Sequence, residues 1–168
     1  MNIETGIGCA FDAQVRAMRR TTFRTYVGSP VRECLPIKKG ARLTQFVLGD
    51  FVSVTGDRTV SPLSAELALG GILHMIHQGA GETLLAVIHV KAILYCACDL
   101  VTDIGEAVFL DLTDSRRRLT MQPADKSKAI QIGLLSALQP DNDRCHIAMA
   151  GVGAKPFTVA RPFRETAR

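Results

Sequence analysis

The chain of 168 residues carries one pattern of strands and turns twice. In the first copy, residues 49–54 (GDFVSV) lead to a glycine-led apolar run at 71–73, then to a polar turn and an apolar strand at 84–88. The second copy repeats this order at 105–110 (GEAVFL), at 133–135 and at 146–150. The offset grows from 56 residues at the first glycine to 62 at the glycine of the apolar run, as a duplication with loop insertions would produce. Because an internal repeat constrains the whole architecture, this one predicts two related β modules.

Short β elements fill both copies. Residues 51–54 alternate with a period of two, and turn residues separate short apolar runs, which is typical of a sandwich or barrel. Residues 78–82 predict a hairpin turn, and 83–98 predict an unusually long strand that closes the first module and enters the second. Apolar residues make up 47% of the chain and Trp is absent, so Val, Ile, Leu and Ala must build the core. We therefore predict a mainly β protein made of two small β-barrel or sandwich modules.

Charge divides the chain into an acidic body and two basic ends. Residues 1–42 hold eight Lys/Arg against three Asp/Glu, and residues 155–168 hold four against one. The intervening residues 43–154 hold eight against twelve, so the overall charge of +4 conceals a negative middle. Basic ends of this kind usually lie against something negative, either nucleic acid or an acidic protein surface.

The basic first segment predicts an extended arm rather than a domain, because it has too few apolar residues to close a core. Pro30 and Pro36 exclude a central strand or a long helix near residues 31–39. Residues 10–20 can form one short helix with an apolar face. We therefore expect a basic N-terminal arm, two β modules and a basic, irregular C-terminal tail, at residues 1–42, 43–98, 99–151 and 152–168.

The sequence offers no constellation that predicts catalysis. No Gly-x-Ser-x-Gly motif occurs, and the glycine-rich stretches lack the Gly-Lys-Ser/Thr that cradles phosphate. His74 and His77 are three residues apart, which on a strand places them on opposite faces, so we expect no metal pair there. Cys96 and Cys98 are separated by one residue, whereas zinc and redox motifs usually have two. We predict no catalytic residue, no metal site and no cofactor, with these cysteines buried as small apolar side chains.

Compartment follows from two further observations. No apolar run approaches the ~18 residues that a membrane span needs, and the N-terminus lacks the basic and apolar regions of a signal peptide. The five cysteines are an odd number, which favours reduced thiols. We expect a soluble protein, made in the cytoplasm, with no membrane partner.

The second copy of the repeat resembles a family of viral structural proteins. Tailed-phage capsid decoration (cement) proteins often read G-D/E-A-V-Y/F-L/W-D, a short variable loop, I-G-I/V/L-A/L, a polar turn and a closing V-x-V/L-x-G strand. This chain follows that order at 103–111 (DIGEAVFLD), 118–120 (RLT), 128–134 (KAIQIGL) and 147–151 (IAMAG). The first copy, at 49–90, is a weaker version, and the resemblance covers about residues 43–151.

The resemblance implies a structural protein, not an enzyme, that binds the outside of a bacteriophage capsid and stabilises it. It also implies a virion location after assembly in the host cytoplasm, the major capsid protein as partner, and a homo-oligomer, most simply a trimer. The basic arm departs from the family pattern, and aromatic side chains among arginines are typical interface anchors. We expect the capsid-binding residues to be Phe11, Arg16, Arg19, Arg20, Phe23, Arg24, Tyr26, Arg161 and Arg164.

Three alternatives stay open at this point. A nucleic-acid-binding β module would wrap phosphate with its basic ends and show a steep salt dependence. Another virion part, such as a tail-tube or head-closure protein, would share the β architecture. An enzyme would have to use Cys96 and Cys98 or the histidines.

Overall fold

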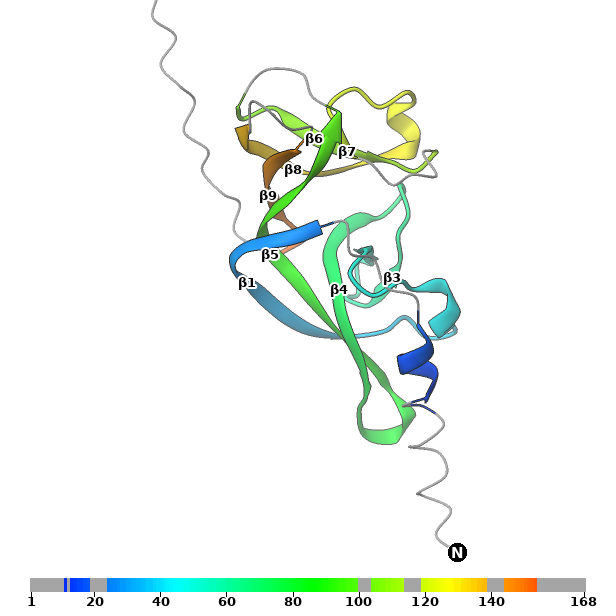
Figure 1. Cartoon of the computed structure of the whole chain (residues 1–168). Helices are drawn as coiled ribbons and strands as arrows, with labels where there is room; N and C mark the ends of the chain where they lie inside the picture. The colour runs from blue at the N-terminus through cyan, green and yellow to red at the C-terminus, as the bar shows by residue number, and fades with distance from the viewer. Residues whose placement is uncertain are drawn as a thin grey trace, which may run out of the picture.

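The computed structural model describes residues 11, 13–18, 24–99, 104–113, 119–138 and 144–153 (Figure 1). Within these residues the chain is mainly β, with one curled and almost entirely antiparallel sheet that forms a half-barrel. Helix is confined there to residues 11 and 13–17 and to three short 3-10 turns. The prediction of a mainly β, barrel-like fold is confirmed.

The sheet contains nine strands in the described part of the chain. Their bounds are β1 Arg24–Pro36, β2 Phe51–Val54, β3 Val60–Pro62, β4 Ala68–Gln78, β5 Leu84–Asp99, β6 Ala107–Asp111, β7 Leu119–Thr120, β8 Ala129–Leu138 and β9 Arg144–Ala150. The 3-10 turns are η1 Leu43–Gln45, η2 Ala80–Glu82 and η3 Lys126–Lys128. The predicted hairpin turn lies at η2, where Gly81 adopts a φ of 64° that glycine tolerates without strain.

Strand β5 is the longest element and pairs with strands from both halves of the chain. Its first part pairs with β4 along Leu84–His89, and its later part pairs with β9 along Lys91–Ala97. On its other edge lie β1 and then β7. Figure 1 shows β5 running from the hairpin with β4 up to the strands of the second half. The prediction of one long strand that serves both halves is confirmed.

Alternation along β5 places one set of its side chains into two buried clusters. Ala86, Ile88 and Val90 pack in a cluster with first-half residues that include Val60 and Leu73. Further along the same face, β5 contributes to a second cluster through Ala92 and Leu94, packed with Leu110, Leu135 and Ile147. Both hydrophobic cores therefore depend on the register of this one strand.

The two halves show the same order of strand pairing. In the first half β3 pairs with β2, β2 with β4, and β4 with β5. In the second half β7 pairs with β6, β6 with β8, and β8 with β9. Two backbone hydrogen bonds also correspond, since Gly49 N donates to Leu73 O and Gly105 N donates to Leu135 O, each at 2.7 Å.

Much of the segment expected to be an extended arm belongs to the sheet. Strand β1 pairs antiparallel with β5 from Arg24 opposite Cys96 to Pro36 opposite Leu85. Ile37 follows as a buried residue and forms a parallel bridge to Val60. The expectation that this stretch is no central strand agrees with the structure, because β1 is paired with no other described strand.

The prolines explain why pattern analysis gave an arm here. Pro30 lies in the irregularity between Val27 and Val31, where a missing amide hydrogen costs no ladder bond, and Pro36 ends the strand. An edge strand tolerates such interruptions. The local sequence does not identify β5 as its pairing partner. The helix expected within 10–20 is present at 13–17, and Phe11 and Met18 pack against the first-half cluster.

The two halves meet at a set of close backbone contacts between β9, β4 and β5. Gly151 N donates to Val90 O at 2.7 Å, and Val152 N donates to Leu69 O at 2.7 Å. A Cβ atom on Gly151 would collide with the carbonyl oxygen of Gly70. The tail expected at 152–168 lies outside the described residues after Gly153.

Gly133 gives a direct test of the sheet geometry. A Cβ atom there would collide with the carbonyl group of Ala148 and lie 3.0 Å from Met149 Cα, and backbone cannot move aside cheaply. We expect Gly133→Ala to lower the free energy of unfolding by about 2–3 kcal/mol, measured by urea denaturation. Gly56→Ala is the control, because nothing lies within 4 Å of its added Cβ. Equal effects of the two substitutions would contradict this packing.

Candidate functional site

The residues predicted for capsid binding do not form one cluster in the described structure. Phe11 is half-buried against the first-half core, whereas Arg16 is exposed on the adjacent helical turn. Tyr26 lies on β1 in a different environment, with 37% of its surface exposed. The backbone of Arg24 is paired in β1. The others lie outside the described residues: Arg19, Arg20, Phe23, Arg161 and Arg164.

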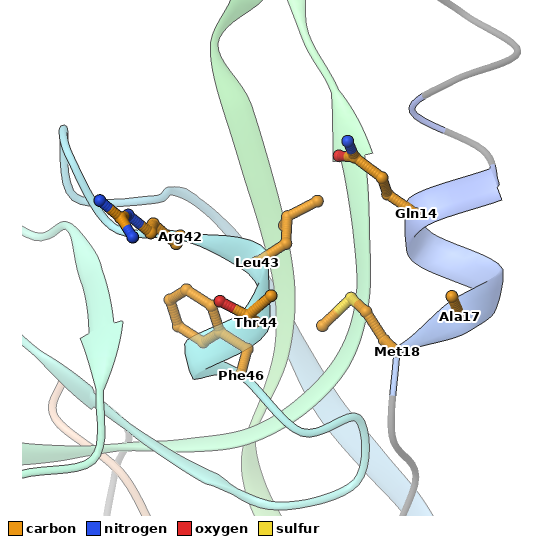
Figure 2. Close-up of a pocket in the computed structure, with 7 residues that line it drawn as sticks. All are labelled: Gln14, Ala17, Met18, Arg42, Leu43, Thr44 and Phe46. Atoms are coloured by element: carbon orange, nitrogen blue, oxygen red, sulfur yellow. The ribbon is translucent and has the colours of Figure 1, made fainter.

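A groove of about 590 Å³ separates the N-terminal helical turn from η1 (Figure 2). Met18 and Leu43 point into the space between the two elements, and Arg42 points away from the helix. The lining is mostly apolar and comprises Gln14, Ala17, Met18, Arg42, Leu43, Thr44 and Phe46. Sequence analysis predicted the short helix but not this groove, because η1 has no periodic signal.

A second feature is an aromatic and basic cluster built by β1, β4 and β5. His89 on β5 is only 2% exposed, although neighbouring odd-numbered residues of the strand are half-buried. The ring of Tyr26 meets it edge-on at a centroid distance of 4.7 Å and an angle of 82°. The ring of His74 stacks on it at 4.7 Å and 26°. Arg32 Nε donates a hydrogen bond to His89 Nε2 at 3.1 Å.

Two irregularities in the sheet bring these residues together. A shift in register between Leu73 and Met75 makes His74 an extra residue on β4, so its ring can lie over His89. A second shift, between Val31 and Arg32 on β1, places Arg32 opposite His89. Neither bulge has a signal in the sequence, which is why pattern analysis missed the cluster.

The hydrogen bond from Arg32 fixes the tautomer of His89. A guanidinium has donors only, so Nε2 must accept and the ring proton must reside on Nδ1. Nδ1 is buried and has no hydrogen-bond partner among the described residues. The cluster therefore carries an unused hydrogen-bond donor. A buried donor of this kind lowers the stability of the folded state by about 1–3 kcal/mol.

The electrostatics of the cluster oppose protonation of His89. Burial is the main cause, followed by the nearby His74 and Arg32, and together they lower its pKa from 6.5 to about 4. His89 is therefore neutral at pH 7, while Arg32 carries a positive charge. The cluster combines one fixed cation with neutral aromatic rings.

Exposed apolar side chains lie beside the cluster. Val31 is 54% exposed on β1 and Met75 is 46% exposed on β4, immediately after His74. With Tyr26 they account for three of the four large hydrophobic residues that are exposed in the described part of the chain. Apolar surface is therefore concentrated around a basic centre, as in many protein interfaces.

His74 and His77 contact different groups, but the prediction that they lie on opposite faces is wrong, because the bulge at His74 interrupts the alternation of β4. His74 stacks on His89, whereas His77 Nε2 lies 3.9 Å from the Sγ atom of the exposed Cys34. No group of three His, Cys, Asp or Glu side chains that could hold a metal ion occurs among the residues that the structure describes. The side chains of Cys96 and Cys98, by contrast, are outside the description.

The buried Asp111 serves to anchor a loop. Its carboxylate accepts hydrogen bonds from Thr113 N at 2.9 Å, Thr113 Oγ1 at 2.6 Å and Ala124 N at 3.0 Å. These bonds, with Thr113 the largest contributor, lower the pKa of Asp111 below its ordinary value. Both carboxylate oxygens accept hydrogen bonds, so Asp111 holds the backbone at Thr113 and Ala124 in place.

Comparison with known proteins gives no relative: no protein-family model and no curated protein matches this chain. Across the described residues, no helix has the length and apolar character required to cross a membrane.

The lowered pKa of His89 predicts a pH-dependent stability. The unfolded chain binds a proton at this histidine below about pH 6.5, whereas the folded chain does so only near pH 4. The stability associated with neutral His89 is complete above pH 6.5 and is lost as the pH falls toward 4. We expect His89→Gln to reduce the loss of unfolding free energy between pH 7 and 4 by up to about 3 kcal/mol, measured by urea denaturation.

His146→Gln is the matched control, because His146 also meets a tyrosine edge-on, at 5.4 Å from Tyr95, but is half-buried. It controls for the loss of a histidine that packs against a tyrosine, and its pH profile is measured beside those of the wild type and His89→Gln. Parallel profiles for the wild type and His89→Gln would show that His89 is not the group responsible.

Proposed function

We propose that this protein is a structural virion component that binds the outside of a phage-like capsid and stabilises it. The observation that carries the proposal is that the exposed apolar side chains of Tyr26, Val31 and Met75 lie on β1 and β4, the strands that flank β5 at His89. Such a surface fits a protein partner better than a small substrate, because it offers contact area without an enclosing pocket. The resemblance of the repeat to capsid decoration proteins supplies the kind of partner.

The sheet edge beside this surface supports the same function. In the described structure β1 is hydrogen-bonded to β5 on one side, and its other side is paired with no described strand between Val27 and Leu35. An exposed edge can accept an extended segment of a partner through main-chain hydrogen bonds. Many copies bound to one closed shell would add avidity, so each contact can be modest.

The proposal includes an internal duplication with basic ends. The matched order of strand pairing, and the equivalent hydrogen bonds of Gly49 and Gly105, support two related modules fused through β5. The exposed Arg16, with the basic residues expected at both ends of the chain, would extend the contact on the capsid. We also propose that copies associate with one another on the particle, that the virion is the site of action, and that no catalysis is involved.

The test is binding to empty shells assembled from the major capsid protein of the same source. We expect the full-length protein to co-sediment with the shells and to raise their melting temperature. The double substitution Val31→Ser with Met75→Ser should weaken binding about tenfold or more, because it removes apolar contact at the centre of the surface. The protein should remain folded, since both side chains are exposed.

Val152→Ser is the matched control, because Val152 is 42% exposed but follows β9. It should bind shells within about twofold of the wild type. Absence of co-sedimentation at low salt would refute the proposal. Binding to generic DNA with a steep salt dependence, and none to shells, would favour the nucleic-acid alternative.

A further inference from the structure

We propose that the cluster around Arg32 and His89 binds a carboxylate carried by an extended segment of the partner protein, with apolar residues on either side of the acid. This deepens the proposed function, and it rests on that function only in taking the partner to be a capsid protein. Three features support this site: the charge of Arg32, the unused donor of His89 and the edge of β1.

Charge is the first step. Arg32 is exposed and forms no ion pair with a described residue, and its Nε is used by His89. The two terminal nitrogens of its guanidinium are left to donate, and a carboxylate is the group that accepts from such a fork with matched geometry. The adjacent His74 is exposed and stacks on the same imidazole ring.

The unused donor is the second step. Nδ1 of His89 carries a proton and has no acceptor among the described residues, although only 2% of the surface of this residue is exposed. Native structures satisfy nearly all such groups, so an isolated one calls for an acceptor, and we assign that acceptor to the bound segment. Arg32 already contacts the Nε2 atom of the same ring, so a carboxylate held by Arg32 would lie beside this imidazole.

The surroundings select a peptide over a nucleic acid. A phosphate backbone would gain little from the exposed apolar side chains of Val31 and Met75, which follow each other across β1 and β4 beside Arg32 and His74. An extended peptide uses all three features, since its main chain pairs with β1, its apolar residues cover Val31 and Met75, and its acid meets Arg32. The occupant is therefore an acidic β-strand segment.

The experiment uses the full-length, isotope-labelled chain and a defined pair of peptides. The probe is acetyl-Thr-Val-Glu-Val-Thr-Val-amide, and the matched peptide has Gln in place of Glu. We expect the Glu peptide to shift the amide resonances of β1 and the imidazole nitrogens of His89, and to bind about tenfold more tightly than the Gln peptide at low salt. This comparison needs no variant and so does not depend on the folding of a mutant.

Variants then assign the acid to its site. Arg32→Gln should abolish the preference for Glu, whereas Arg42→Gln, which removes an exposed arginine beside η1, should preserve it. Equal binding of the two peptides, shifts confined to residues away from β1, or no binding at millimolar peptide would overturn the inference. Stronger shifts of β1 by a single-stranded oligonucleotide than by the Glu peptide would overturn it as well.

The two proposals fail separately. Shells that bind the wild type and Arg32→Gln equally would remove the carboxylate site and leave the capsid function standing. A protein that prefers the Glu peptide but does not bind shells would retain the carboxylate site and lose the capsid function.

Discussion

The continuous pairing of β5 is the constraint on which the rest of the structure depends. Its sixteen residues supply one wall of each hydrophobic cluster and a hydrogen-bonding edge to four other strands. A slip of one residue would turn Ile88 and Leu94 outward and carry His89 inward, so both cores and the aromatic cluster share one register. The sheet can curl into a half-barrel because this strand is long enough to be bordered by different partners at its two ends.

The sequence predicted those elements whose signal is local. The repeated glycines, the period of two at β2 and the long apolar run of β5 identified the β class, the hairpin turn at η2 and the strand that serves both halves. The pairing of β1 with β5 was missed, because prolines and polar residues occur in edge strands as well as in extended arms. The two possibilities differ only in whether the segment pairs with the edge of β5 that β4 and β9 leave open, and the local sequence does not show this. The contact of Tyr26, Arg32 and His74 with His89 was missed because it depends on two bulges that no residue type announces. The local sequence pattern therefore predicts the strands, whereas the cluster around His89 depends on the register between them.

Neutral His89 beneath Arg32 and His74 illustrates how a β surface can acquire specificity without a pocket. Three strands each contribute a side chain, and burial keeps the central ring uncharged so that it can pack beside the guanidinium of Arg32. The result is a surface with a fixed positive centre, an unused donor and an apolar rim. The proposed recognition of a capsid segment draws on all three, while the groove beside η1 remains an independent feature of the N-terminal part.

The close approach of Gly151 to Gly70 has a mechanical consequence. Because β9 returns to touch β4 beside β5, the two halves share backbone contacts as well as a strand, and neither can separate without stripping hydrogen bonds from β5. A force directed along β1 would load its backbone hydrogen bonds to β5 in shear. A body joined in this way would yield as one unit, which suits a clamp placed across a strained shell better than two domains on a flexible hinge.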